Sequence, residues 1–127
     1  MTEWILVFLG GGFGALSRHG VNLAASRIAG FDFPLGTMFI NITGSFLMGI
    51  LAAWFAFRGA GGLTQHMRLL LTTGVLGGYT TFSTFSLEAA LLWERGAVSG
   101  ALFYVLGSVM LSILSLFLGL WLVRAIS

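Results

Sequence analysis

The stretch from Gly77 to Ser86, GGYTTFSTFS, places two glycines, a run of hydroxyl side chains and two phenylalanines inside an apolar segment. No charged residue occurs between Leu69 and Leu87, so the segment is apolar enough to cross a membrane. Irregular backbone at membrane depth is tolerated only where it is buried in protein or lines a wet cavity. The pattern therefore predicts a broken helix at an ion or substrate site. A small-residue packing face between helices is the alternative.

The two phenylalanines of this stretch suggest one way to bind an anion. Phe82 and Phe85 are three residues apart, so they share a face if the chain is helical there. An aromatic ring has a negative face and a positive edge. Two ring edges can therefore contact a small anion without a full countercharge. Ordinary core packing is the alternative for both rings.

Two further segments carry polar residues along one helical face. In the second apolar segment, Asn41 is the notable member, because its amide can either donate to an ion or form an interhelical hydrogen bond worth about 0.6 to 2 kcal/mol. In the last apolar segment, hydroxyls recur at helical spacing and form a ladder. Helix contact is again the alternative. The two faces consist of Thr37, Asn41, Gly44, Ser45 and Met48, and of Tyr104, Ser108, Ser112 and Ser115.

Two ionisable residues lie deep in apolar segments. Arg18 is too far from the start of the first segment to be an ordinary surface residue; it either snorkels to the interface or supplies positive potential at a vestibule. Glu88 follows the GGYTTFSTFS stretch by one turn. A buried carboxylate there costs roughly 3 kcal/mol unless it is paired. It can bond Asn41 or a hydroxyl, pair with Arg18, or be protonated and couple transport to protons.

The composition indicates which elements must position these residues. The chain is 57% hydrophobic and 8% charged, whereas soluble domains are about 25% charged. We expect a single, all-α transmembrane domain over residues 1–127, because a helix needs about 20 apolar residues to cross the hydrocarbon. The expected helices cover about 3–28, 34–57, 67–93 with a break near 77–81, and 97–125. No catalytic constellation or metal-ligand spacing is present in the sequence, so we do not expect an enzyme.

The arginines show almost no positive-inside bias. If the N-terminus is cytoplasmic, Arg58, Arg68 and Arg124 lie on one side and Arg27 and Arg95 on the other. A chain without this bias can insert in both orientations and pair with itself antiparallel. Four short helices also enclose little space on their own, so a homo-oligomer is expected.

Three motifs together resemble the Fluc (CrcB) fluoride channel family over essentially the whole chain. The first segment contains GGGFGALSR, the second GTMFINITGSFLMG, and the third the highly specific GVLGGYTTFSTFSLE. His19 stands where an aromatic residue is common in the family, and the last segment matches less specifically.

The resemblance implies an antiparallel dual-topology homodimer with two separate fluoride pores in the cell inner (plasma) membrane. Phe82 and Phe85 would form an aromatic box along the anion path, Asn41 would be a pore-lining donor, and Arg18 would lie near the vestibule. The remaining implied residues are a polar track of Thr81, Ser83, Thr84, Ser108 and Ser112, with Tyr104 as its neighbour and Thr37 and Glu88 in support.

The resemblance also implies a structural sodium ion (Na+) on the two-fold axis. Its ligands would be backbone carbonyls at the helix break, from Gly77 and Thr80 of each subunit. A broken helix frees carbonyls, and carbonyls suit hard cations.

The function that the resemblance implies is a passive, highly selective fluoride channel that lets cytoplasmic fluoride leave the cell and confers fluoride resistance. Amide, hydroxyl and ring-edge donors would replace the water around fluoride, and the absence of a fixed central charge would permit fast exit. The chief alternative is a small four-helix proton-coupled multidrug exporter. Such exporters need an embedded carboxylate, typically in the first span, where this chain has Arg18 instead. A non-transporting assembly subunit is a third possibility, and it does not explain GGYTTFSTFS.

Overall fold

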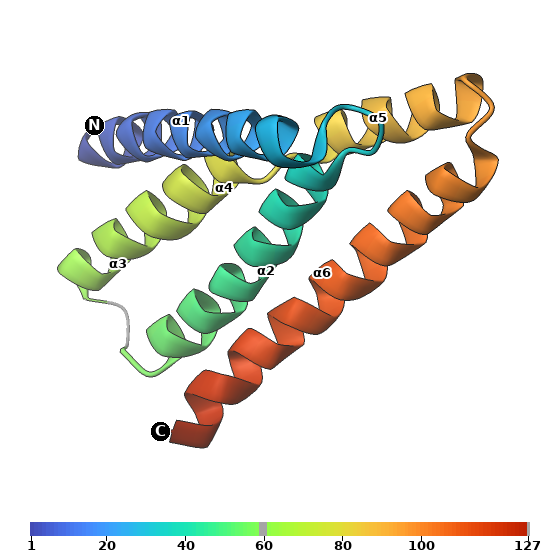
Figure 1. Cartoon of the computed structure of the whole chain (residues 1–127). Coiled ribbons are helices and arrows are strands. Elements are labelled where there is room, and N and C mark those ends of the chain that lie inside the picture. Colours follow the sequence, from blue (N-terminus) through green and yellow to red (C-terminus); the bar gives the residue numbers. More distant parts are fainter. Residues whose placement is uncertain (59–60, 127) are drawn as a thin grey trace.

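The computed structural model describes residues 1–58 and 61–126, and within these ranges all regular secondary structure is helical, without strands. Four helices follow one another, and the third is bent (Figure 1). The prediction of an all-α fold with four helices and a broken third one is confirmed. The helical elements are α1 (Thr2–Ala29), α2 (Leu35–Ala56), α3 (Gly62–Arg68), the π-helix η1 (Leu69–Leu76), α4 (Gly77–Tyr79), α5 (Phe82–Glu94) and α6 (Val98–Ile126).

The third helix is interrupted where the sequence predicts. It runs through α3, η1 and α4, then leaves helical geometry at two residues before continuing as α5. Thr80 has φ −82° and ψ 157°, and Thr81 has φ −153° and ψ 122°, so both are extended. This pair of extended residues separates a half-helix that ends at Tyr79 from one that begins at Phe82.

The π-helical segment before the break is a feature that the sequence does not predict. The Thr72 hydroxyl donates to the Arg68 carbonyl at 2.6 Å, and so occupies the oxygen that the Thr72 N–H would use in an α-helix. At the other end of η1, the Gly77 N–H reaches the Thr72 carbonyl, five residues back. Thr72 therefore contributes both its hydroxyl and its carbonyl to the hydrogen bonds of this wider turn.

Glycines allow two pairs of helices to approach closely. A Cβ atom at Gly14 of α1 would lie 2.0 Å from the Val75 carbonyl oxygen, and one at Gly49 of α2 would lie 2.2 Å from the Leu116 carbonyl oxygen of α6. Neither site has room for a side chain larger than hydrogen. These contacts hold α1 against the first half of the third helix, and α2 alongside α6, with which it runs parallel (Figure 1).

The outer surface exposes many large apolar side chains, which would be unfavourable in water. Both α2 and α6 are long and apolar enough to cross a membrane, and only 17% of the most apolar window of α6 is buried. Large side chains such as Leu106, Phe117 and Trp121 are therefore exposed along α6. A surface of this kind is stable against lipid or another protein. We conclude that the chain is a membrane protein; the spanning of α1 and of the interrupted third helix stays a prediction.

Candidate functional site

Asn41 of α2 holds the interrupted third helix at the break. Its Oδ1 accepts a hydrogen bond from the Thr81 N–H at 2.9 Å, and its Nδ2 donates to the Thr81 carbonyl at 3.0 Å. The side-chain amide thus satisfies both backbone groups of an extended residue, which would otherwise be unpaired in an apolar environment. One N–H of the Asn41 amide is not used in this pair.

The hydroxyls after the break form the cap of α5. The Thr81 Oγ1 accepts a hydrogen bond from the Thr84 N–H at 3.2 Å, as an N-cap residue does. Thr81 Oγ1 also lies 3.2 Å from the Thr84 hydroxyl and 3.3 Å from the Ser83 hydroxyl. The structure therefore joins three of the hydroxyls predicted for a polar track into one small network, with Thr81 buried at its centre.

The same contacts remove the helical donors from two backbone carbonyls. In a continuous α-helix, the Gly77 carbonyl would accept from the Thr81 N–H, and the Thr80 carbonyl would accept from the Thr84 N–H. Those two N–H groups donate instead to Asn41 and to the Thr81 hydroxyl. Both carbonyls thus lack their i+4 donors, and Gly77 is exposed.

A partly open cavity of about 350 Å³ lies between α2, the break and α6. None of the described residues that line it is charged. Two of them, Ser108 and Ser112 on α6, have buried hydroxyl oxygens with no hydrogen-bond partner within the described residues. Unpaired buried hydroxyls are uncommon and point to an absent partner. The polar and aromatic lining comprises Asn41, Ser45, Thr80, Thr81, Phe82, Phe85, Ser108 and Ser112, and the remainder is Gly44, Met48, Val109, Ile113 and Leu116.

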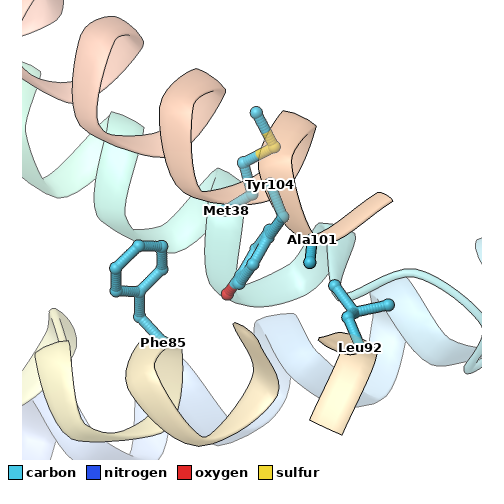
Figure 2. Close-up of a cluster of buried hydrophobic side chains, with 5 residues drawn as sticks. All are labelled: Met38, Phe85, Leu92, Ala101 and Tyr104. Atoms are coloured by element: carbon cyan, nitrogen blue, oxygen red, sulfur yellow. The ribbon is translucent and has the colours of Figure 1, made fainter. Parts of the chain in front are cut away.

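A row of aromatic rings leads from this cavity toward the far end of α5. The Phe82 and Phe85 ring centroids are 5.5 Å apart, and that of Phe85 is 5.1 Å from that of Tyr104. Phe33 also contacts Tyr104 edge to face, with the ring centroids 5.5 Å apart. Figure 2 shows Tyr104 projecting from α6 toward α5, with Phe85 to one side. Phe85 is 8% exposed and Phe82 is 76% exposed, so the two predicted box residues differ sharply in environment.

Glu88 is paired with Tyr104, whose ring is fully buried. The Tyr104 hydroxyl donates to the Glu88 Oε1 at 3.2 Å. Of the partners considered for Glu88 from the sequence, the structure thus selects a hydroxyl and not Asn41 or Arg18. Thr37 is the other residue predicted to support the ion path. Its buried hydroxyl lies beside Tyr104 but forms no hydrogen bond within the described residues.

Glu88 also borders a second, more polar cavity of about 300 Å³ at the ends of α1 and α5. Asn22, Asp32 and Arg95 line it as well, and the Arg95 guanidinium donates to the Asp32 backbone carbonyl. The carboxylate therefore lies between this outer cavity and the aromatic row.

The structure leaves one predicted residue apart from these contacts. Arg18 is half-buried on α1, one turn beyond Gly14, and it lines neither of the two cavities described above. It makes no ion pair within the described residues. Conversely, sequence reasoning missed the hydrogen bond of 2.9 Å between the Tyr79 and Thr43 hydroxyls. Thr43 was outside the predicted polar face of α2, and no spacing rule connects it to a residue on another helix.

Comparison with known proteins places the chain in a family. The family described as "CrcB-like protein, Camphor Resistance (CrcB)" matches residues 5–120. The chain belongs to the CrcB family. Proteins named "Fluoride-specific ion channel FluC" are similar to it over most or all of their length. That of Rhodopseudomonas palustris (strain BisB5) is 60% identical over 98% of each chain, and that of Beijerinckia indica is 56% identical over 100% of each. That of Methylobacterium nodulans is 62% identical over 86% of each. The resemblance to this family inferred from the motifs is confirmed.

Proposed function

We propose that this CrcB-family protein is a passive, selective fluoride channel that lets cytoplasmic fluoride leave the cell and so lowers its toxicity. The names of its relatives support the substrate. The observation that carries the proposal is the uncharged cavity beside the helix break, where the buried Ser108 and Ser112 hydroxyls have no hydrogen-bond partner among the described residues. These hydroxyls can donate hydrogen bonds to an ion bound in the cavity.

The chemistry of the cavity suits a small, strongly hydrated anion. Fluoride must exchange water for other donors, and the free N–H of Asn41 and the two serine hydroxyls provide them. The positive edges of the Phe82 and Phe85 rings add weaker contacts. Because the cavity lining contains no arginine or lysine, the anion is not held by a full countercharge and can leave quickly.

We propose that the channel is an antiparallel, dual-topology homodimer spanning the inner (plasma) membrane several times. Phe82 supports this assembly, because it lines the cavity and yet is 76% exposed, so a second copy could complete the wall there. The near-equal division of the arginines between the two ends supports insertion in both orientations. An antiparallel pair would contain two such cavities.

We also propose a structural sodium ion between the two copies. The exposed Gly77 and Thr80, three residues further on, have carbonyls without their helical donors, and hard cations prefer such oxygen ligands. Two copies meeting at this point would present four carbonyls to one ion. Sodium there would offset the repulsion between carbonyl dipoles that face one another.

Fluoride efflux from proteoliposomes tests the function directly. Liposomes loaded with potassium fluoride or potassium chloride would be diluted into a fluoride- and chloride-free medium, and ion-selective electrodes would record release. A passive channel should release fluoride only after valinomycin lets potassium follow, with no matching chloride release. Release that needs no valinomycin would indicate proton-coupled transport, and no release from a verified folded protein would contradict the proposal.

A further inference from the structure

One end of the molecule carries three arginines that form no ion pair with an acid among the residues that the structure describes. The last turn of α2, the start of the third helix and the last turn of α6 all lie at this end, toward the lower left of Figure 1. Arg58 lies just past the end of α2, Arg68 is the last residue of α3, and Arg124 lies in the last turn of α6. At the opposite end, Arg27 and Arg95 lie close in the chain to Asp32 and Glu94, and Arg95 donates to the Asp32 carbonyl.

Two aromatic rings position the guanidinium groups of Arg58 and Arg68. The Arg58 Cζ lies 4.3 Å from the centroid of the Trp54 ring, and the Arg68 Cζ lies 5.8 Å from that of Phe55. The Trp54 and Phe55 rings are themselves 5.1 Å apart and contact edge to face. A guanidinium stacked on a ring keeps its N–H donors free at the edge. These contacts place the two arginines on neighbouring rings at the same end of the molecule.

The donors of these arginines are mostly unused. Arg68 donates to the Gln65 side-chain oxygen at 3.2 Å, and neither Arg58 nor Arg68 forms an ion pair within the described residues. A carboxylate partner would be the usual way to satisfy such groups. The cluster therefore presents two positive charges and several N–H donors to whatever lies beside it.

The depth of the cluster identifies the partner. Arg58 follows the apolar span of α2, which ends at Ala56, so the cluster lies at the level of the lipid headgroups. Tryptophan and arginine are common at that level, and basic pockets there bind anionic lipid headgroups. Guanidinium groups match the geometry of phosphate oxygens.

We propose that Arg58 and Arg68, held on Trp54 and Phe55, bind the phosphate of an anionic phospholipid such as phosphatidylglycerol. Zwitterionic lipids also contain phosphate, but their ammonium group is repelled by the two arginines. The site is separate from the proposed fluoride path and does not depend on it. In a dual-topology pair, each membrane surface would present one such site.

Native mass spectrometry of the full chain, titrated with phosphatidylglycerol or phosphatidylcholine of the same acyl chains, tests this proposal. The variant Arg58→Gln with Arg68→Gln removes the site, and Arg27→Gln with Arg95→Gln removes the same charge at the opposite end. The first variant should weaken phosphatidylglycerol binding about 30-fold, from the attraction of each arginine to an anionic surface. The second variant should bind as the unchanged protein does. Trp54→Leu, which keeps both charges, should give a smaller loss.

Three results would overturn the proposal. Equal losses in the two double variants would mean that net charge, and not this site, attracts the lipid. Equal binding of phosphatidylglycerol and phosphatidylcholine by the unchanged protein would remove the selectivity. Complete displacement of the lipid by excess inorganic phosphate would show that the site binds free anions instead. Melting curves of each variant would establish that all are folded.

Discussion

The side chain of Asn41 forms two hydrogen bonds with Thr81, 40 residues further along the chain. They satisfy both the N–H and the carbonyl of Thr81 at the helix break. The pair ties α2 to the third helix at the edge of the uncharged cavity. Asn41 therefore has a structural task in addition to any contact with an ion. Because one amide N–H is left over, the two tasks do not exclude each other.

Replacing Asn41 with aspartate should stop fluoride flux and weaken the fold. An aspartate keeps the acceptor for the Thr81 N–H, but it loses the donor to the Thr81 carbonyl and brings a negative charge to the cavity. We expect a loss of about 1–3 kcal/mol in unfolding free energy from the broken bond, and no measurable efflux because the charge repels the anion. Asn22→Asp, on α1 and outside this cavity, is the control. Undiminished efflux in Asn41→Asp would remove Asn41 from the ion path.

Phe82→Ile and Phe85→Ile should both impair fluoride flux, but they should differ in their effect on the stability of the fold. Phe85 is 8% exposed and packs against Tyr104, so Phe85→Ile should cost about 1–2 kcal/mol of stability. Phe82 is 76% exposed within one chain, so Phe82→Ile should leave the stability of the monomer nearly unchanged. Efflux and thermal melting of both variants would be compared with Phe117→Ile, an exposed position away from the cavities. Normal flux in both variants would contradict the aromatic-box prediction.

Removing the unpaired hydroxyls separates function from folding most clearly. A hydroxyl that is buried without a partner costs free energy, so Ser108→Ala and Ser112→Ala should leave the melting temperature unchanged or raise it. If those hydroxyls serve the ion, flux should nevertheless fall. Ser86→Ala is the matched control, because the Ser86 hydroxyl donates to the Phe82 carbonyl and does not line the cavity. A drop in stability without a change in flux would indicate that the serines are structural.

The sequence predicts the break because its cause is local. Glycine, β-branched threonine and hydroxyls that compete for backbone groups are concentrated in one stretch, and the extended Thr80 and Thr81 lie inside it. The partners across the break are not local. Nothing in the spacing of residues assigns Asn41 to Thr81, Thr43 to Tyr79, or Glu88 to Tyr104, because each pair depends on how the helices cross.

The π-helical turn illustrates the same limit on a smaller scale. A threonine in an apolar helix usually bonds back to a carbonyl without widening the turn, so the Thr72 hydroxyl does not by itself predict η1. The close packing of α1 against this segment depends on Gly14 facing Val75, which the GxxxG spacing of Gly10 and Gly14 suggests only in general terms. The face that carries chemistry is thus readable from sequence, and its exact contacts require the tertiary structure.

Removing sodium should weaken the proposed dimer or stop flux, since the exposed carbonyls of two copies would then repel each other without a cation between them. Size-exclusion chromatography and efflux would be measured in sodium and in N-methylglucamine with a sodium chelator. Gly77→Ala adds a geometric test. A Cβ atom at Gly77 would meet only the Thr72 carbonyl oxygen, at 3.7 Å, so the single chain should tolerate it. In the dimer, the added methyl group should obstruct a second copy that approaches the Gly77 carbonyl. The dissociation constant of the dimer should therefore rise. Gly12→Ala, at an exposed glycine whose Cβ would meet nothing within 4 Å, is the control. A dimer that is indifferent both to sodium and to Gly77→Ala would exclude a metal site at this break.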